Sequence, residues 1–159
     1  MIVISDTSPL NYLVLLDEIE LLPKLFGTII IPPAVLSELQ RIEAPIEVKA
    51  WLSTNPTWLE LRTASVIDLT IRLGAGECEA ISLAKELNAD LIDDRKARQA
   101  AIERGLRVAG TLNILELASI KNLVELTETF DKLQQTNFRV SQELLNEALE
   151  REKQRKAVS

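Results

Sequence analysis

The chain has 159 residues and a net charge of −6, from 18 Lys and Arg against 24 Asp and Glu, and it contains no His. The absence of His excludes Ser-His-Asp and Cys-His catalysis and every His-ligated metal site. The single cysteine, Cys78, excludes an internal disulfide framework. Carboxylates are therefore the side chains best able to carry catalysis in this chain.

The first part of the chain alternates between strand and helix patterns. The β-branched run over residues 2–5 predicts a strand, and Pro9 suits the first turn of a following helix. Asp17 is expected to begin a second short helix, which Gly27 ends. The apolar run over residues 28–31 predicts a strand covered on both faces, as in a parallel sheet. The next predicted helices are 33–42 and 44–52.

The same alternation continues to the C-terminal end of the chain. The further predicted strands are 58–62, 90–93 and 106–109, and the further predicted helices are 65–73, 77–87, 94–104, a segment from Thr111 to Ile120, 123–135 and 141–155. This order predicts an α/β fold: a three-layer α/β/α domain over residues 1–135 with a mainly parallel sheet of about five strands. A C-terminal helical extension is expected over residues 136–159.

Three acids directly follow predicted strands. Asp6 comes after the first strand, and Asp93 and Asp94 close the fourth. Ligands of open parallel sheets lie outside the carboxyl ends of the strands. If these two strands are neighbours, their ends are about 4.8 Å apart and the carboxylates share one pocket. The alternative for Asp6 and Asp94 is that each only begins a turn or caps a helix.

Three glutamates on predicted helices are candidates for the same pocket. Glu38 lies on the flank of the apolar face of its helix, and Glu77 and Glu79 open the helix after Gly76. Glu77 falls near the buried face, where a glutamate is unusual unless something pairs with it. The alternatives are a solvated Glu38 and two glutamates that only complement a helix dipole.

An acidic cluster of this kind predicts a hard divalent cation. Carboxylates within about 6 Å repel one another, and a cation relieves that repulsion. Oxygen ligands without His or Cys select Mg²⁺ or Mn²⁺, which suits phosphodiester hydrolysis. Thr7 and the basic run of Arg95, Lys96 and Arg98 are candidates for binding the phosphates of a substrate. A solvated basic helix face is the alternative for that run.

Taken together, these segments resemble the PIN-domain nucleases, specifically the VapC-like toxins and their PIN-like relatives. The matching segments are IVISDTSPL, IPPAVLSELQ, LGAGECEAISLA, and LIDDRKAR followed by GLRVAGTLNIL. They spread over roughly residues 1–120. The resemblance implies a compact α/β/α domain with a parallel sheet, acids that hold Mg²⁺ or Mn²⁺, and cleavage of single-stranded RNA. It also implies a toxin of a type II toxin–antitoxin pair, which binds an antitoxin protein and forms a homodimer.

Carried over residue by residue, the resemblance implies catalytic roles for Asp6, Glu38, Glu79 and Asp94. The position of Glu77 near the buried face of its helix makes it a fifth catalytic candidate. The metal ligands are expected among Asp6, Asp94, Glu77 and Asp93. The sequence departs from the family pattern in three ways: Glu79 stands where Asp is common, Ile92 replaces a usual Thr, and Asp93 is an extra acid. Glu77 therefore competes with Glu79 for one role, and Asp93 with Asp94 for another.

Two other functions compete with this interpretation. One is a catalytically inactive PIN-like binding module. The other is a phosphotransfer receiver, which needs an acid pair at the first strand and a Lys at the fifth; residues 106–110 contain no Lys. The start of the sequence has no signal-peptide pattern and no stretch predicts a membrane span, so we expect a cytoplasmic protein that does not contact membranes.

Overall fold

A computed structural model describes residues 1–94 and 96–158 of the chain, in two compact units, Met1–Thr111 and Leu112–Ser159. The elements of the first unit are β1 (Val3–Ser5), α1 (Thr7–Leu15), α2 (Leu21–Phe26), β2 (Ile29–Ile31), α3 (Pro33–Leu39), α4 (Ile46–Ser53), β3 (Leu59–Leu61), α5 (Ala75–Leu87), β4 (Asp90–Ile92), α6 (Lys96–Glu103) and β5 (Val108–Ala109). Helix α7 (Thr111–Ile120) begins at the boundary, and α8 (Leu126–Gln134) and α9 (Gln142–Val158) complete the second unit. The expected division at residue 135 stays a prediction.

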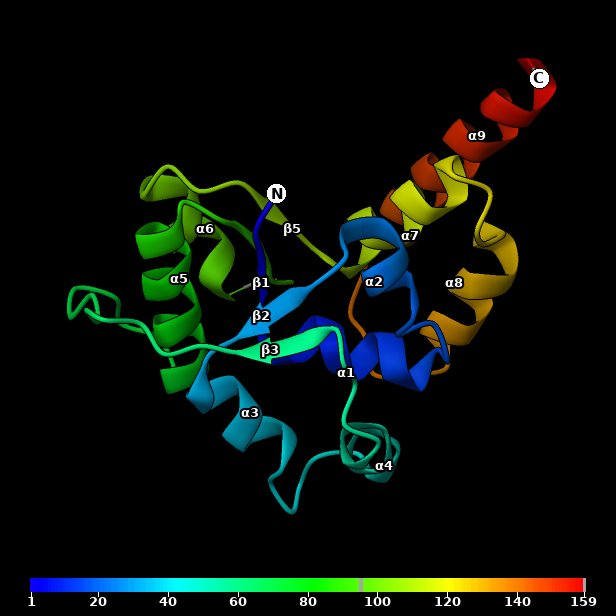
Figure 1. The fold of residues 1–159 in the computed structure, drawn as a ribbon. Helices are drawn as coiled ribbons and strands as arrows, with labels where there is room; N and C mark the ends of the chain where they lie inside the picture. Colours follow the sequence, from blue (N-terminus) through cyan, green and yellow to red (C-terminus); the bar gives the residue numbers. More distant parts are fainter. Residues whose placement is uncertain (95, 159) are drawn as a thin grey trace. The chain divides into compact units, whose positions relative to one another are not determined.

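The first unit is built on a five-stranded sheet in which every neighbouring pair is parallel, in the order β3-β2-β1-β4-β5 (Figure 1). The three central strands are the apolar runs of the sequence, and nearly all of their side chains are buried. Because successive side chains point to opposite faces, such runs need helices on both sides of the sheet. The predicted α/β fold is confirmed.

Helices cover the two faces of this sheet. On one face, Ile4, Ile30 and Leu91 pack in a buried cluster with Ile81 of α5 and Ala97 of α6. The alternate residues of the same strands point to the opposite face, where α1 contacts α3 and α4. All strands are parallel, so their carboxyl ends lie along one edge of the sheet, and that edge carries the candidate site.

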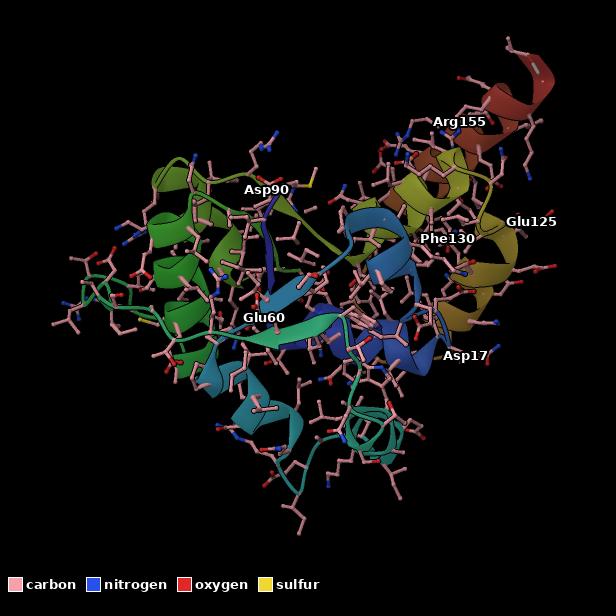
Figure 2. All side chains as sticks on the ribbon, viewed as in Figure 1. Asp17, Glu60, Asp90, Glu125, Phe130 and Arg155 are labelled. Carbon is pink, nitrogen blue, oxygen red and sulfur yellow. The ribbon has the colours of Figure 1, made fainter. Side chains whose placement is uncertain are left out.

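The second unit has a buried interior of its own. Leu115, Leu126, Phe130 and Leu145 are buried there, and Figure 2 labels Phe130 on α8. The carboxylate of Glu152 accepts a 2.5 Å hydrogen bond from Ser119 Oγ and a 3.0 Å bond from the backbone N–H of Leu126. Glu152 thus satisfies an amide at the start of α8 that has no partner within the helix.

Two local predictions were wrong. Residues 65–73 form no helix, because side chains take the hydrogen bonds of their backbone. The backbone N–H of Asp68 bonds to Ser82 Oγ, and that of Thr70 bonds to Asp68 Oδ1. Asp17 has a left-handed φ of 58° and ends the first helical segment; the next helix begins only at Leu21.

Candidate active site

The first and fourth strands are neighbours, which was the condition for a shared acidic pocket. Ser5 pairs with Ile92 in the parallel register, and the backbone N–H of Asp6 donates a 2.9 Å hydrogen bond to the carbonyl of Ile92. Asp6 and Asp93 therefore leave the sheet side by side from adjacent strands. This arrangement follows from sheet order, which the sequence leaves open.

Asp6 and Asp93 form a buried acid pair. Their relative exposures are 6% and 2%, and the two carboxyl groups are hydrogen bonded to each other. Burial, followed by the hydrogen bond and the negative charge of Asp93, raises the pKa of Asp6 to about 9. Oδ2 of Asp93 also accepts a 3.1 Å bond from the N–H of Ala97, in the first turn of α6. Asp93 therefore provides the helix-capping contact that the sequence suggested for Asp94.

Asp94 is held by donors from two other elements. Its Oδ2 accepts bonds from Ser8 Oγ at 2.9 Å and Thr111 Oγ1 at 3.1 Å, and its Oδ1 accepts a 2.7 Å bond from the N–H of Thr111. Burial raises the pKa of Asp94, and these hydrogen bonds oppose the shift. The side chain links the start of α1 to Thr111, at the end of the first unit. Its expected role as a metal ligand stays a prediction.

Glu38 reaches the same end of the sheet from α3. Its Oε2 accepts a short hydrogen bond from Thr7 Oγ1, so Thr7 positions an acid in this structure; its expected role in substrate binding stays a prediction. Gly76 lies against the same carboxylate: a Cβ at this position would be 2.6 Å from Glu38 Oε1. Only a residue without a side chain leaves Glu38 this room.

The structure separates the two glutamates at the start of α5. The pKa of Glu77 is raised by burial and then by the charge of Asp93, with Glu38 adding to the increase and Lys96 opposing it. Glu77 therefore lies among the site acids. Glu79 turns elsewhere, and its Oε1 accepts a 3.0 Å bond from the N–H of Ala34 in the first turn of α3. These contacts favour Glu77 for the site and a structural role for Glu79.

The donor set suits a hard divalent cation bound by few protein ligands. Asp6 Oδ1 and Glu77 Oε2 are buried and have no hydrogen-bond partner among the described residues. Within residues 1–94 and 96–158, no group of three or more Cys, Asp or Glu side chains is arranged to hold a metal. Mg²⁺ commonly takes one or two carboxylates and keeps several waters, so the two unpartnered oxygens fit that ion.

The structure describes two of the three basic residues that the sequence offered for substrate binding, Lys96 and Arg98. Lys96 is exposed at the start of α6, and its charge acts on Glu77. Arg98 is exposed on the same helix. Arg95 lies outside the described residues. An exposed Lys96 close to the half-buried Glu77 provides a local positive charge beside an acidic pocket.

Sequence reasoning missed three contributors to this site. Ser8 and Thr111 both donate hydrogen bonds to Asp94, and no sequence pattern predicts these contacts. The contact of Gly76 with Glu38 depends on α3 and α5 lying side by side. The partners in these contacts are 17 to 86 positions apart in the sequence, so no local pattern could have paired all of them.

Comparisons with known proteins identify the family and support the fold. A PIN domain family model matches residues 2–154, nearly the whole chain. A solved structure of a PilT N-terminus domain protein from the hyperthermophilic archaeon Sulfolobus solfataricus is similar, with a TM-score of 0.53 and 23% identity. The likeness covers 72% of this chain and 91% of that one. The comparison with curated proteins finds no match.

PIN domains are generally nucleases, and the family generally uses a divalent metal ion. Among the described residues, no helix is both long and apolar enough to span a membrane. The family match covers the sheet, the acidic pocket at its carboxyl edge and most of α9. By this match, the chain belongs to the PIN domain family.

Proposed function

We propose that this protein is an endoribonuclease that cleaves single-stranded RNA with Mg²⁺ or Mn²⁺. The observation that carries the proposal is the pair of buried, unpartnered carboxylate oxygens, Asp6 Oδ1 and Glu77 Oε2, at the carboxyl edge of the sheet. A buried polar atom without a partner is costly unless something binds it. Membership of the PIN domain family supports the same chemistry.

Asp6 and Glu77 would hold the divalent ion, which supplies, when bound, a Lewis acid that activates water and stabilises developing phosphate charge. Glu38, which Thr7 holds in place, can accept a proton from the attacking water at its carboxylate. Lys96 adds positive charge where the phosphates of the RNA must approach. Asp93 accepts from the first turn of α6, and Asp94 accepts from Ser8 of α1 and from Thr111, all beside this pocket.

The wider roles are proposed on the family resemblance alone. The protein would be the toxin of a type II toxin–antitoxin pair in the cytoplasm, bound by an antitoxin protein and assembled as a homodimer. A second candidate function is a PIN-like module that binds RNA without cleaving it. It is favoured by the oxygens of Asp93 and Asp94 that are already bonded to protein donors.

One assay separates the two functions. Purified protein, free of any partner and stripped of metal, is mixed with labelled single-stranded RNA, double-stranded RNA and single-stranded DNA. We expect cleavage of single-stranded RNA only, on addition of Mn²⁺ or Mg²⁺, and loss of cleavage with EDTA. Binding of RNA in a polarisation assay, with no cleavage of a broad RNA panel under Mn²⁺, would establish the binding module instead.

Gly76→Ala should act through Glu38. The new methyl group takes the space of Glu38 Oε1, so the carboxylate must move and lose its bond from Thr7. We expect the rate of metal-dependent cleavage to fall roughly tenfold to a hundredfold, as for a displaced catalytic group. Gly74→Ala tests the neighbouring acid in the same assay and should have a smaller effect, because its Cβ would lie 3.2 Å from Glu77 Oε1.

A double-mutant cycle tests whether Gly76→Ala lowers the cleavage rate by displacing Glu38. If Gly76 matters only because it leaves room for Glu38, the Gly76→Ala change should add little once Glu38 is replaced by Gln. Additive losses in the Glu38→Gln/Gly76→Ala protein, or a large fall in thermal stability with Gly76→Ala, would show that the glycine serves the fold instead.

A further inference from the structure

Arg62 lies at the carboxyl edge of the sheet, the edge that carries the acidic pocket. It directly follows β3, and its backbone N–H donates a 3.0 Å hydrogen bond to the carbonyl of Ile31 at the end of β2. The strand order β3-β2-β1 places it two strand spacings, about 10 Å, from the strand that precedes Asp6. Arg62 is therefore close enough to contact a polymeric substrate of the pocket without touching the reacting atoms.

The side chain of Arg62 lies on the face of the sheet that α5 and α6 cover. Glu60, which Figure 2 labels on β3, pairs in register with Ile30, and Ile30 packs in the buried cluster with residues of these two helices. Side chains alternate along a strand, so Arg62 shares the face of Glu60. Glu77 belongs to α5 and Lys96 to α6. Arg62 is thus on the same side of the sheet as these two residues.

Arg62 makes a long and exposed ion pair within the chain. Its Nε lies 3.7 Å from Glu60 Oε2, too far for a hydrogen bond, and the two side chains are 47% and 45% exposed. Exposed pairs of this kind contribute little free energy. Arg107, in contrast, donates hydrogen bonds of 2.9 and 3.0 Å to Asp90. The planar guanidinium of Arg62 therefore remains able to bind a phosphate with two parallel hydrogen bonds.

Two other exposed basic residues border the pocket. The charge of Lys96 acts on Glu77. Arg72 is exposed two positions before Gly74, the N-cap of α5, so their Cα atoms are within about 8 Å of each other. Gly74 in turn lies against the carboxylate of Glu77, since a Cβ at Gly74 would be 3.2 Å from Glu77 Oε1. Positive charge from the end of β3, from the segment before α5 and from the start of α6 therefore borders the acids.

We propose that Arg62 and Arg72 bind phosphates that neighbour the scissile phosphate, so that single-stranded RNA lies along the carboxyl edge from Lys96 toward β3. This inference rests on the proposed function and deepens it by assigning the path of the substrate. A nucleic-acid strand carries one charge per nucleotide, so further phosphates lie within about 10 Å of the scissile one. The two arginines contact the backbone and not the bases, so they raise the affinity for every sequence alike.

Fluorescence polarisation in EDTA measures RNA binding without cleavage. The probe is a labelled single-stranded RNA of about ten nucleotides, titrated at several salt concentrations. We expect Arg62→Ala to raise the dissociation constant about fivefold, for oligo-U and oligo-A alike. The slope of log affinity against log salt should fall by about 0.7, the value for one phosphate contact on a single strand. Arg72→Ala should act similarly, and the two losses should add in Arg62→Ala/Arg72→Ala.

Three further variants separate a phosphate contact from general electrostatics. Arg107→Ala is the matched control: its side chain is 81% exposed, but it precedes β5 at the amino edge of the sheet, so the salt slope should not change. Arg62→Lys keeps the charge and should keep the slope. Glu60→Gln removes the acid beside Arg62 and should tighten binding. An unchanged slope in Arg62→Ala/Arg72→Ala overturns the proposal, and so do equal losses in Arg62→Ala and Arg107→Ala.

Cleavage kinetics with Mn²⁺ distinguish this inference from the proposed function. Arg62→Ala should raise KM for the longer RNA and leave kcat unchanged, because it removes binding that is equal in the ground and transition states. It should have little effect on a dinucleoside monophosphate, which carries only the scissile phosphate. A fall in kcat with KM unchanged overturns the assigned path while the nuclease function stands. If the wild type binds RNA through Arg62 and cleaves none, the nuclease function is wrong and the assigned path stands.

Discussion

Asp6→Asn should reduce metal-dependent RNA cleavage by about a hundredfold or more. The change keeps the size of the side chain but removes its charge, and it converts an unpartnered carboxylate oxygen of the pocket to an amide. Loss of residues that only support metal ligands typically costs 10- to 100-fold, so the loss of a ligand should cost at least as much. Single-turnover cleavage of labelled RNA with Mn²⁺ measures the effect, and circular dichroism checks the fold.

Glu77→Gln and Glu79→Gln form a matched pair for the same assay. Both glutamates lie in the first turns of α5, but only Glu77 has a buried oxygen without a partner. We expect Glu77→Gln to behave like Asp6→Asn, and Glu79→Gln to keep most of the activity, because its amide oxygen can still accept from Ala34. Equal losses in both variants, or full activity in Asp6→Asn, would contradict the proposed site.

The metal-free protein should become less stable as the pH rises from about 4 to about 9. In this range the unfolded chain has released the Asp6 proton, whereas the folded protein retains it, since the folded pKa is about 9 against an ordinary 3.8. The folded state therefore binds more protons, and the free energy of unfolding falls with pH. One such group contributes at most about 1.4 kcal/mol per pH unit.

Urea unfolding with EDTA, at about pH 5 and about pH 8, measures this dependence. The amide in the Asp6→Asn variant cannot titrate, so the free energy of unfolding of this variant should depend less on pH. At the higher pH, this variant should be more stable than the wild type. The low pKa of Asp68, caused by hydrogen bonds from Thr70, Lys85 and Arg104, affects stability only at more acidic pH. Mn²⁺ should raise the stability of the wild type more than that of Asp6→Asn. If the free energy of unfolding of the wild type depended on pH no more than that of Asp6→Asn, the assignment of this proton to Asp6 would be wrong.

Much of the fold could be predicted because local patterns dominate it. The apolar runs at Ile29–Ile31 and Asp90–Ile92 and the breaks at Gly27 and Gly105 each mark an element in the sequence. The prediction failed at residues 65–73, where the bonds that decide the conformation come from Ser82 and Glu86 of α5. A helical composition cannot show that distant side chains will take the backbone bonds.

The candidate site was only partly predictable, for a similar reason. Strand ends identify Asp6 and Asp93 as candidates, because position along a strand is a local property. The choice between Glu77 and Glu79 depends on the groups that surround each side chain, and Glu79 accepts a hydrogen bond from the start of α3. Likewise, Asp94 accepts hydrogen bonds from Ser8 and Thr111, which are 86 and 17 positions away in the sequence.

The sequence by itself determined which chemistry is possible: in a chain without His, with one Cys and with acids after its strands, carboxylates are the side chains best able to carry catalysis. It also determined the alternation of strand and helix, since hydrophobic period and turn residues are encoded locally. The tertiary structure alone decided which acids face one another and which are bonded to protein donors. Those outcomes depend on sheet order and helix packing, which bring together residues that no sequence spacing relates.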